Sequence, residues 1–480
     1  MQTSELNDII NQIIKRKHET NNIELKSAQF GCPKRLYDTL SSFSNQDDGG
    51  IIIFGIDEDN GYLPVGVYDP QDLQKQINNQ CKDMEPVVRP LITVSDFDGK
   101  SIVAAEIPGI EITQRPCYYK GKGKMKGSYT RIGDSDEPMT DYEIYSYEAY
   151  RKKYLDDIRP IEGAAIDAID KTKLEEYKFL CKKDRPNLSR FSDKQFNEMM
   201  GITKGGKPTL MSLLLFGLYP QAFFPQLSIV ATAVYGTEMG FTGENGERFS
   251  DNKRIEGTVG EMIDGAMQFV KNNMKISTTI DPLTGVRKDR PEYPITAVRE
   301  VIVNALVHRD YSFHTEGMPI QLTVFGDRIE IKNPGGLYGR LRIDQLGKVQ
   351  PDTRNPKLAT AMEIMCLTEN RYSGIPTIRA EMAQFGLPAP IFEDNRETFS
   401  VTLYKTPLAA KKSKITNDEI LEFCSVPRSR EEISGFLGIT TTSYAISKYI
   451  KPLIKSGKIA ALIENAPNSP DQRYMTVRGE

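Results

Sequence analysis

The chain has 480 residues, with 62 Lys or Arg and 65 Asp or Glu, so its formal net charge is −3. This near balance excludes a global attraction to nucleic acid or membranes, and any such attraction must be local. The six cysteines are scattered without a Cys-x-x-Cys pair, which disfavours a disulfide framework or a zinc site and fits a reducing cytoplasm. The N-terminus is too charged for a signal peptide, and prolines interrupt the uncharged run 208–237, so we expect no membrane segment.

At about 150 residues per domain, the length predicts about three domains. The first, residues 1–150, contains an alternating strand at 23–27, a helix through 40–45 and a continuous apolar strand at 51–56. A strand that is apolar throughout is typical of a sheet covered on both faces. A further strand is expected at 101–107. We therefore expect an α/β domain.

A basic tract lies near the end of this domain, with six cations and no acid in 17 residues. Its cations are Arg115, Lys120, Lys122, Lys124, Lys126 and Arg131. Three tyrosines are interleaved, and three glycines should keep the tract flexible. Cations contact phosphates and aromatic rings stack on bases, so the tract predicts nucleic-acid binding. The alternative is a solvated hairpin tip that is charged only for solubility.

Three motifs give this domain a family resemblance. Glu24-Leu25-Lys26, the run 49–57 and the segment 129–133 together resemble the Schlafen/AlbA-type domain. The resemblance implies binding of DNA or RNA and, in some members, nuclease activity. Glu19 and Glu24 match the spacing of two acids in Schlafen-type nucleases, with Asp57 as a possible third. The simpler interpretation of Glu24 is an ion pair with Lys26 at a strand edge.

Residues 160–290 form a middle α/β region in which no chemistry is readable, and the next domain spans 291–408. Its first helix carries Glu300, Asn304 and His308 on one face, because they are spaced by four residues. A carboxylate can polarise a water molecule, and an amide oxygen one turn away can bind a hard cation such as Mg2+. A hairpin around residues 326–327 then leads to the turn Asn333-Pro334-Gly335-Gly336, whose glycines allow close backbone approach.

This order of motifs resembles the Bergerat fold, the ATP-binding domain of the gyrase/Hsp90/histidine-kinase/MutL superfamily. A closer resemblance is to a bacterial subgroup, often described as RecG-like, with an NALVHRDY box and an NPGGL turn. The resemblance implies that Glu300 activates water and that Asn304 binds Mg2+. The residues implied around ATP are Asn304, Asn333, Gly335, Gly336, Ser373 and Gly374.

Two positions depart from the superfamily pattern. The adenine-side turn usually opens with Asp, whereas this chain has Asn333. The second phosphate turn has Tyr372 where the subgroup has its first glycine. We expect residues 337–356 to form a mobile lid over the nucleotide.

The C-terminal domain, 412–480, is predicted to be a winged helix. Three helices are expected, at 417–424, 430–437 and 444–455, followed by a two-stranded wing. Helix-turn-helix proteins place a recognition helix in the major groove. The residues expected to face DNA are Thr441, Thr442, Ser443, Tyr444 and Lys448. The alternative is a winged helix that makes protein contacts.

We therefore expect an α+β multidomain protein that binds ATP and Mg2+, and that binds nucleic acid, DNA rather than RNA. Its function would be that of a cytoplasmic transcriptional regulator with slow conversion of ATP and water to ADP and phosphate. One alternative is an ATP-gated, metal-dependent Schlafen-type nuclease acting on RNA or DNA, in defence. A second is a binding protein with a degenerate nucleotide site. By resemblance, a homo-oligomer is expected.

Overall fold

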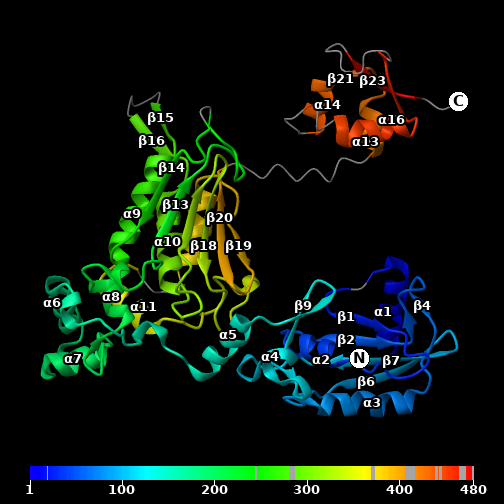
Figure 1. Cartoon of the computed structure of the whole chain (residues 1–480), viewed down its shortest axis with the longest axis horizontal. Helices are drawn as coiled ribbons and strands as arrows, with labels where there is room; N and C mark the ends of the chain where they lie inside the picture. Colours follow the sequence, from blue (N-terminus) through cyan, green and yellow to red (C-terminus); the bar gives the residue numbers. More distant parts are fainter. Residues whose placement is uncertain are drawn as a thin grey trace. The chain divides into compact units, whose positions relative to one another are not determined.

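The computed structural model describes residues 1–18, 20–243, 246–280, 287–368, 373–405, 417–437, 442, 446–463 and 472–477, with a few of these described at the backbone only. The chain divides into two compact units, Met1–Thr406 and Pro407–Glu480. Figure 1 shows the elements of both units. Within the described ranges, no helix combines the length and apolar content that crossing a membrane requires.

The first part of the chain builds a four-stranded sheet in the order β1-β2-β7-β6. Strands β1 and β2 are parallel, and the other neighbours are antiparallel. The strands are β1 (Ile23–Lys26), β2 (Gly50–Phe54), β6 (Leu91–Phe97) and β7 (Lys100–Ile107). Shorter strand pairs lie beside it: β3 (Ile56–Asp57) with β4 (Leu63–Pro64), and β5 (Met84–Glu85) with β8 (Tyr118–Tyr119).

Helices cover both faces of this sheet, which explains the continuous apolar sequence of β2. On one face, α1 (Thr3–Arg16) buries Leu6, Ile10 and Ile13 against a core that includes Ile53. On the other, α2 (Tyr37–Ser44) and α3 (Pro70–Lys82) share a core with Ile52 and other residues of β2 and β7. Successive β2 side chains thus enter opposite cores.

The second sheet has six strands in the order β14-β13-β17-β18-β20-β19. All neighbours are antiparallel except β13 and β17, which are parallel. The strands are β13 (Ile229–Ala233), β14 (Asp251–Ile255), β17 (Ile320–Val324), β18 (Arg328–Pro334), β19 (Ile391–Asp394) and β20 (Thr398–Tyr404). A separate two-stranded ribbon pairs β15 (Ile276–Ile280) with β16 (Arg287–Pro291).

This sheet crosses the boundary expected at residue 291. Strands β13 and β14 come from the segment assigned to the middle region, yet Ile229 pairs with Ile320 and Ala233 with Val324. The physical reason is that β13 and its partner β17 are far apart in the chain, since the paired residues Ile229 and Ile320 are separated by 91 positions. Local periodicity cannot reveal such a pairing. The two segments expected at 160–290 and 291–408 share one continuous core.

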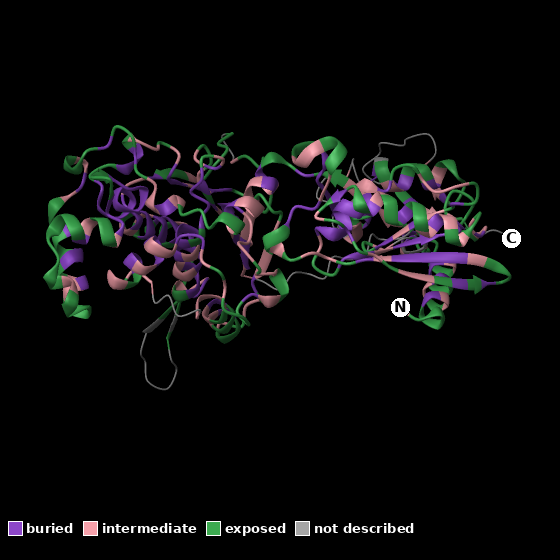
Figure 2. Ribbon diagram, turned by 90° about the horizontal axis from the view of Figure 1, so that it is seen from below, coloured by how far each residue is buried: buried purple, intermediate pink, exposed green. Residues whose placement is uncertain are grey.

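Three helices pack on this sheet or on one another: α9 (Val259–Asn273), α10 (Ile295–His308) and α12 (Gly374–Gln384). Helix α10 contacts both α9 and α12 and buries most of its apolar residues. In Figure 2 the buried residues, in purple, run through the strands and the inner sides of the helices. The polar face of α10 is therefore held in one orientation.

The remaining helices of this unit lie before and after the sheet strands. They are α4 (Gly123–Gly127), α5 (Asp141–Lys152), α6 (Lys171–Asp184), α7 (Asp193–Met200), α8 (Leu210–Phe216) and α11 (Pro356–Ile364). Every residue of α8 is buried. Between α7 and α8, β11 (Thr203–Lys204) and β12 (Lys207–Pro208) form a small hairpin.

The second unit has its own small core of buried side chains. Its elements are α13 (Asn417–Phe423), β21 (Arg428–Ser429), α14 (Arg430–Leu437), the helical turn Ile446–Ile450, α16 (Lys451–Lys455), β22 (Ile459–Ala461) and β23 (Arg473–Thr476). The strands form a sheet in the order β21-β23-β22. Helices followed by an antiparallel pair are compatible with a winged helix, which remains a prediction.

Candidate functional site

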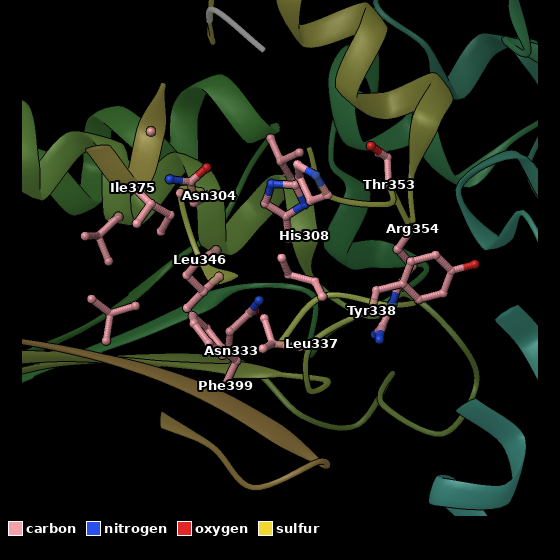
Figure 3. A pocket seen from close by; sticks show the side chains of 18 of the residues that line it. Asn304, His308, Asn333, Leu337, Tyr338, Leu346, Thr353, Arg354, Ile375 and Phe399 are labelled. Carbon is pink, nitrogen blue, oxygen red and sulfur yellow. The ribbon is translucent and has the colours of Figure 1, made fainter. Parts of the chain in front are cut away.

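One pocket opens between α10, the turn after β18, the N-terminus of α12 and the segment that precedes α11. Glu300, expected to activate water, lines it together with all six residues expected around ATP: Asn304, Asn333, Gly335, Gly336, Ser373 and Gly374. Figure 3 shows Asn304 and His308 on one side of the pocket and Asn333 and Phe399 on the other. Segments that are up to 101 residues apart in the sequence, from Glu300 to Val401, therefore meet here.

The polar pair of α10 is arranged by one hydrogen bond. The Asn304 Nδ2 atom donates to the Glu300 Oε1 atom over 3.2 Å. Because the Asn304 amide nitrogen faces Glu300 in this bond, the Asn304 Oδ1 atom points away from Glu300. An amide oxygen beside a carboxylate is a ligand set that suits Mg2+. Both side chains are half-buried, so they remain accessible from the pocket.

The N-terminus of α12 lies directly against this pair. Helix α12 begins at Gly374, and a Cβ atom there would lie 2.4 Å from Glu300 Oε1 and 2.8 Å from Asn304 Nδ2. A side chain at this position would displace the Glu300 carboxylate. The first N–H groups of a helix lack intrahelical partners and carry partial positive charge, which attracts carboxylates and phosphates. The phosphate side of the pocket is therefore expected here.

The glycines of the turn after β18 are needed for packing. Gly335 has φ +95°, and a Cβ atom there would lie 2.5 Å from the Arg354 guanidinium. Gly335 and Gly336 donate their N–H groups to the carbonyls of Glu397 and Arg396 over 2.8 Å and 3.1 Å. These N–H groups are therefore already used within the fold, although both glycines line the pocket.

A buried ion pair between Arg354 and Asp310 fixes the same turn. The sequence alone did not predict this structural role for either residue. Arg354 Nη1 lies 3.0 Å from Asp310 Oδ2, and Arg354 Nη2 donates to the Gly336 carbonyl over 3.2 Å. The backbone N–H of Asp310 donates to the Pro334 carbonyl. Arg354 is only 7% exposed and supports the turn. The sequence signal that could have identified Asp310 is the run His308-Arg309-Asp310-Tyr311, which directly follows the helix.

Asn333 is the polar residue of an otherwise apolar wall. It follows Ile329 and Ile331 on the face of β18 that points toward the helices, where alternation would place an apolar residue. Its side chain is 5% exposed, and its Oδ1 atom accepts no hydrogen bond from any described residue. Five apolar side chains also line this part of the pocket: Ile331, Leu346, Ile378, Phe399 and Val401.

His308 also lines the pocket, one turn beyond Asn304. Its ring is accessible from the pocket, but the surrounding walls desolvate it and lower its pKa to about 4, and the Arg354 charge acts in the same direction. His308 is therefore neutral near pH 7, and it presents a hydrogen-bonding ring without adding positive charge.

The segment expected to form a lid does border the pocket. Its lining residues are Leu337, Tyr338, Leu341, Leu346, Gly347, Val349, Pro351, Asp352, Thr353 and Arg354. The Leu346 carbonyl accepts a hydrogen bond from Arg379 of α12 over 2.8 Å, and the Leu346 side chain is buried. The segment thus rests on the helix whose N-terminus faces Glu300.

The two arginines of the basic tract were expected at the surface, in contact with nucleic acid, but both are buried. Arg115 is 7% exposed and pairs with Asp47 over 2.7 Å. Arg131, in β9 (Tyr129–Ile132), is 5% exposed and pairs with Glu24 over 2.9 Å and with Asp136 over 3.0 Å. A buried arginine needs carboxylate partners, and these come from distant parts of the sequence. Both arginines support the fold and are not positioned to contact phosphates.

The four lysines of the tract lie on helical backbone and not at the tip of a hairpin. Residues 120–122 form a 3₁₀ turn that runs into α4. Lys122 Nζ lies 4.7 Å from the Tyr37 ring centroid, and Lys124 pairs with Glu148 over 2.6 Å. Tyr119 stacks on Tyr37. The exposed lysines remain candidates for phosphate contact, whereas part of the aromatic surface is used internally.

The acids considered for a nuclease do not form a cluster in the part of the chain that is described. Glu24 is paired with Arg131 and with Lys26, as the simpler interpretation predicted. Asp57 lies on the short strand β3, and Glu19 lies outside the described residues. Among described residues, no group of three His, Cys, Asp or Glu side chains could hold a metal ion.

The candidate DNA contacts of the second unit are only partly described. Thr441, Ser443 and Tyr444 lie outside the described residues. Thr442 is helical, and Lys448 is exposed on the helical turn Ile446–Ile450. Their role in DNA binding therefore stays a prediction.

Comparisons with protein families match three segments of the chain. Residues 19–140 match the model described as "Schlafen, AlbA_2", and residues 317–403 match the model described as "Putative ATP-dependent DNA helicase recG C-terminal", named HATPase_c_4. Residues 147–229 match a domain of unknown function, DUF8451. The first two matches confirm the Schlafen/AlbA and RecG-like resemblances, and the α+β multidomain fold class is likewise confirmed.

Two solved structures are similar to the chain. The DIP2311 protein from Corynebacterium diphtheriae shares 17% identity, with 99% of this chain and 97% of that chain covered and a TM-score of 0.40. The N-terminal domain of a "Putative ATP-dependent DNA Helicase RecG-related Protein" from Nitrosomonas europaea shares 30% identity, with 29% and 95% covered and a TM-score of 0.24. No curated protein matches the chain.

Proposed function

We propose that this chain is a cytoplasmic regulator that binds ATP and nucleic acid, DNA in preference to RNA, and controls transcription. The observation that supports the ATP site best is the pocket that brings Glu300, Asn304 and the start of α12 together with the turn after β18. The HATPase_c_4 match over residues 317–403 supports the same assignment.

Each part of the pocket has a distinct role in this proposal. Glu300 would accept a proton from a water molecule, and the Asn304 Oδ1 atom would bind Mg2+, which supplies charge neutralisation beside the phosphates. The N–H groups at the start of α12 would bind phosphate oxygens. Asn333 would contact the base in the apolar part of the pocket. The product of slow turnover would be ADP.

The nucleic-acid part of the proposal is supported by the "Schlafen, AlbA_2" match and by the lysines of the basic tract. Lys120, Lys122 and Lys126 are exposed on one helical segment, and Lys124 is partly exposed. The second unit would add DNA contacts from the helical segment that includes Lys448. The preference for DNA depends on that unit, because a winged helix reads the major groove.

For the ATP site, the test is a thermal melt and a direct binding measurement with Mg-ATP. A ligand that binds only the native state raises the melting temperature. We expect binding by the wild type and none by Asn304→Ala, since Mg2+ loses its ligand beside the triphosphate. Thr360→Ala on α11 is a suitable control, because the Thr360 hydroxyl donates a hydrogen bond within its own helix, to the Pro356 carbonyl. Equal stabilisation of wild type and Asn304→Ala would contradict the site.

For nucleic acid, the test is a salt titration of binding by the wild type and by a variant with Gln at Lys120, Lys122, Lys124 and Lys126. Each duplex phosphate neutralised contributes about −0.9 to the slope of log K against log salt, so the four-Gln variant should lose up to about 3.6 units of that slope. Lys15→Gln with Lys75→Gln, both exposed on α1 and α3, is the control. Identical slopes would remove the tract from the interface. Metal-dependent cleavage of the probe would favour the nuclease alternative.

A further inference from the structure

Asn333 is a buried polar residue in the apolar wall of the pocket. It is 5% exposed, it lines the pocket, and its Oδ1 atom has no partner among the described residues. Its neighbours on the same wall, Ile331, Phe399 and Val401, have no polar side-chain atoms. A buried amide oxygen without a partner is costly, and a donor on the ligand would remove that cost.

An amide and a carboxylate impose different rules on the base. A carboxylate has only acceptors, so it favours the 6-amino group of adenine and opposes the 6-oxo group of hypoxanthine or guanine. An amide has an acceptor and two donors. In one orientation it accepts from the adenine amino group and donates to N1, and after a half-turn about its last torsion it donates to a 6-oxo group and accepts from N1–H.

Resting on the proposed nucleotide site, we propose that Asn333 makes this pocket accept 6-oxopurine nucleoside triphosphates as well as ATP. No described residue donates to the Asn333 Oδ1 atom, so no observed bond selects one amide orientation. The apolar side chains of the same wall do not distinguish the two edges. The identity of residue 333 is therefore what sets base selectivity.

The experiment measures the dissociation constants of ATP and inosine triphosphate with the full chain in Mg2+ at pH 8. These probes differ only at the 6-position and N1. In the wild type the two constants should lie within about tenfold of each other, because each base can form two hydrogen bonds with Asn333. In Asn333→Asp the inosine nucleotide should weaken at least about tenfold more than ATP. The alkaline pH keeps the aspartate ionised, since a protonated carboxyl could again donate.

The outcomes separate the inference from the site on which it rests. If the wild type binds ATP more than about tenfold more tightly than the inosine nucleotide, the inference is overturned but the ATP site is not. The same holds if Asn333→Asp leaves the ratio of the two dissociation constants unchanged. A wild type that binds neither nucleotide overturns the site as well. If Asn333→Asp does not fold, the triphosphate of unsubstituted purine riboside replaces it. That probe lacks the 6-substituent and should bind the wild type at least about tenfold more weakly than ATP and the inosine nucleotide, and equal binding of all three overturns the inference.

Discussion

Gly374 lies against Glu300 and Asn304 of α10, so the effect of a substitution there on ATP turnover can be estimated from the structure. In Gly374→Ala the new Cβ atom would lie 2.4 Å from Glu300 Oε1 and 2.8 Å from Asn304 Nδ2, where ordinary contact begins at 3.4 Å. The Glu300 carboxylate therefore has to move by about 1 Å. Misplacing a catalytic group by that distance can cost about 100-fold in rate. We expect ATP turnover to fall by about 10- to 100-fold.

Folding should be affected much less than turnover by this substitution. Gly374 has no positive φ, and the atoms that the new methyl group meets are the ends of side chains. Alanine also has the better helix propensity, by up to about 1 kcal/mol. We therefore expect the free energy of unfolding to change by less than about 1 kcal/mol. Denaturant melts measure this change independently of ATP.

The matched control is Gly260→Ala. Gly260 is also near the start of a helix, α9, and a Cβ atom there would meet only Leu367, at 3.8 Å. Steady-state phosphate release and the Kd for Mg-ATP are measured for both variants and the wild type. A Gly374→Ala protein that folds, binds Mg-ATP and turns it over at the wild-type rate would refute the reasoning. An equal loss in Gly260→Ala would point to general destabilisation.

Four further outcomes are expected. Glu300→Gln should keep the Mg-ATP-induced rise in melting temperature and lose phosphate release, because only the base is removed. Hydrogen exchange across residues 337–357 should slow when a non-hydrolysable analogue is added, and unchanged exchange despite proven binding would exclude a lid. Removing residues 411–480 should leave the Kd for Mg-ATP unchanged and weaken binding to a genomic DNA pool. Finally, the His308 pKa is lowered to about 4 in the folded chain, so the unfolded chain binds a proton first as pH falls. The free energy of unfolding should therefore decrease from pH 6.5 toward pH 4, and His308→Gln should flatten that dependence in pH-dependent melts.

The residues of the candidate site could be found from the sequence because most of its signals are local. Glu300 and Asn304 share a face through helical spacing, and the turn at residues 333–336 carries its glycines in sequence. The closeness of Gly374 to Glu300 has a different origin, since α12 follows α10 by more than 60 residues. The two elements were assigned to the same site from the order of the family motifs, because helical periodicity gives no information about contacts between distant helices.

Charge patterning predicted the basic tract but not the burial of its arginines. Arg115 pairs with Asp47, and Arg131 pairs with Glu24, which lies 107 positions earlier. Whether a cation faces solvent or a buried carboxylate depends on tertiary contacts that a local window does not contain. The same limit explains why β13 and β14 were separated from the sheet that they complete.

The six-stranded sheet has a practical consequence for dissecting the protein. The family match at residues 317–403 covers β17, β18, α12, β19 and β20, but it omits β13, β14 and α10. A recombinant fragment cut to that match would lose Glu300 and Asn304 and would expose the edge of β17 that pairs with β13. Unpaired strand edges promote aggregation, so such a fragment should be insoluble as well as inactive. Because one core joins residues 161–403, expression trials should begin before Ile161 and end after Leu403.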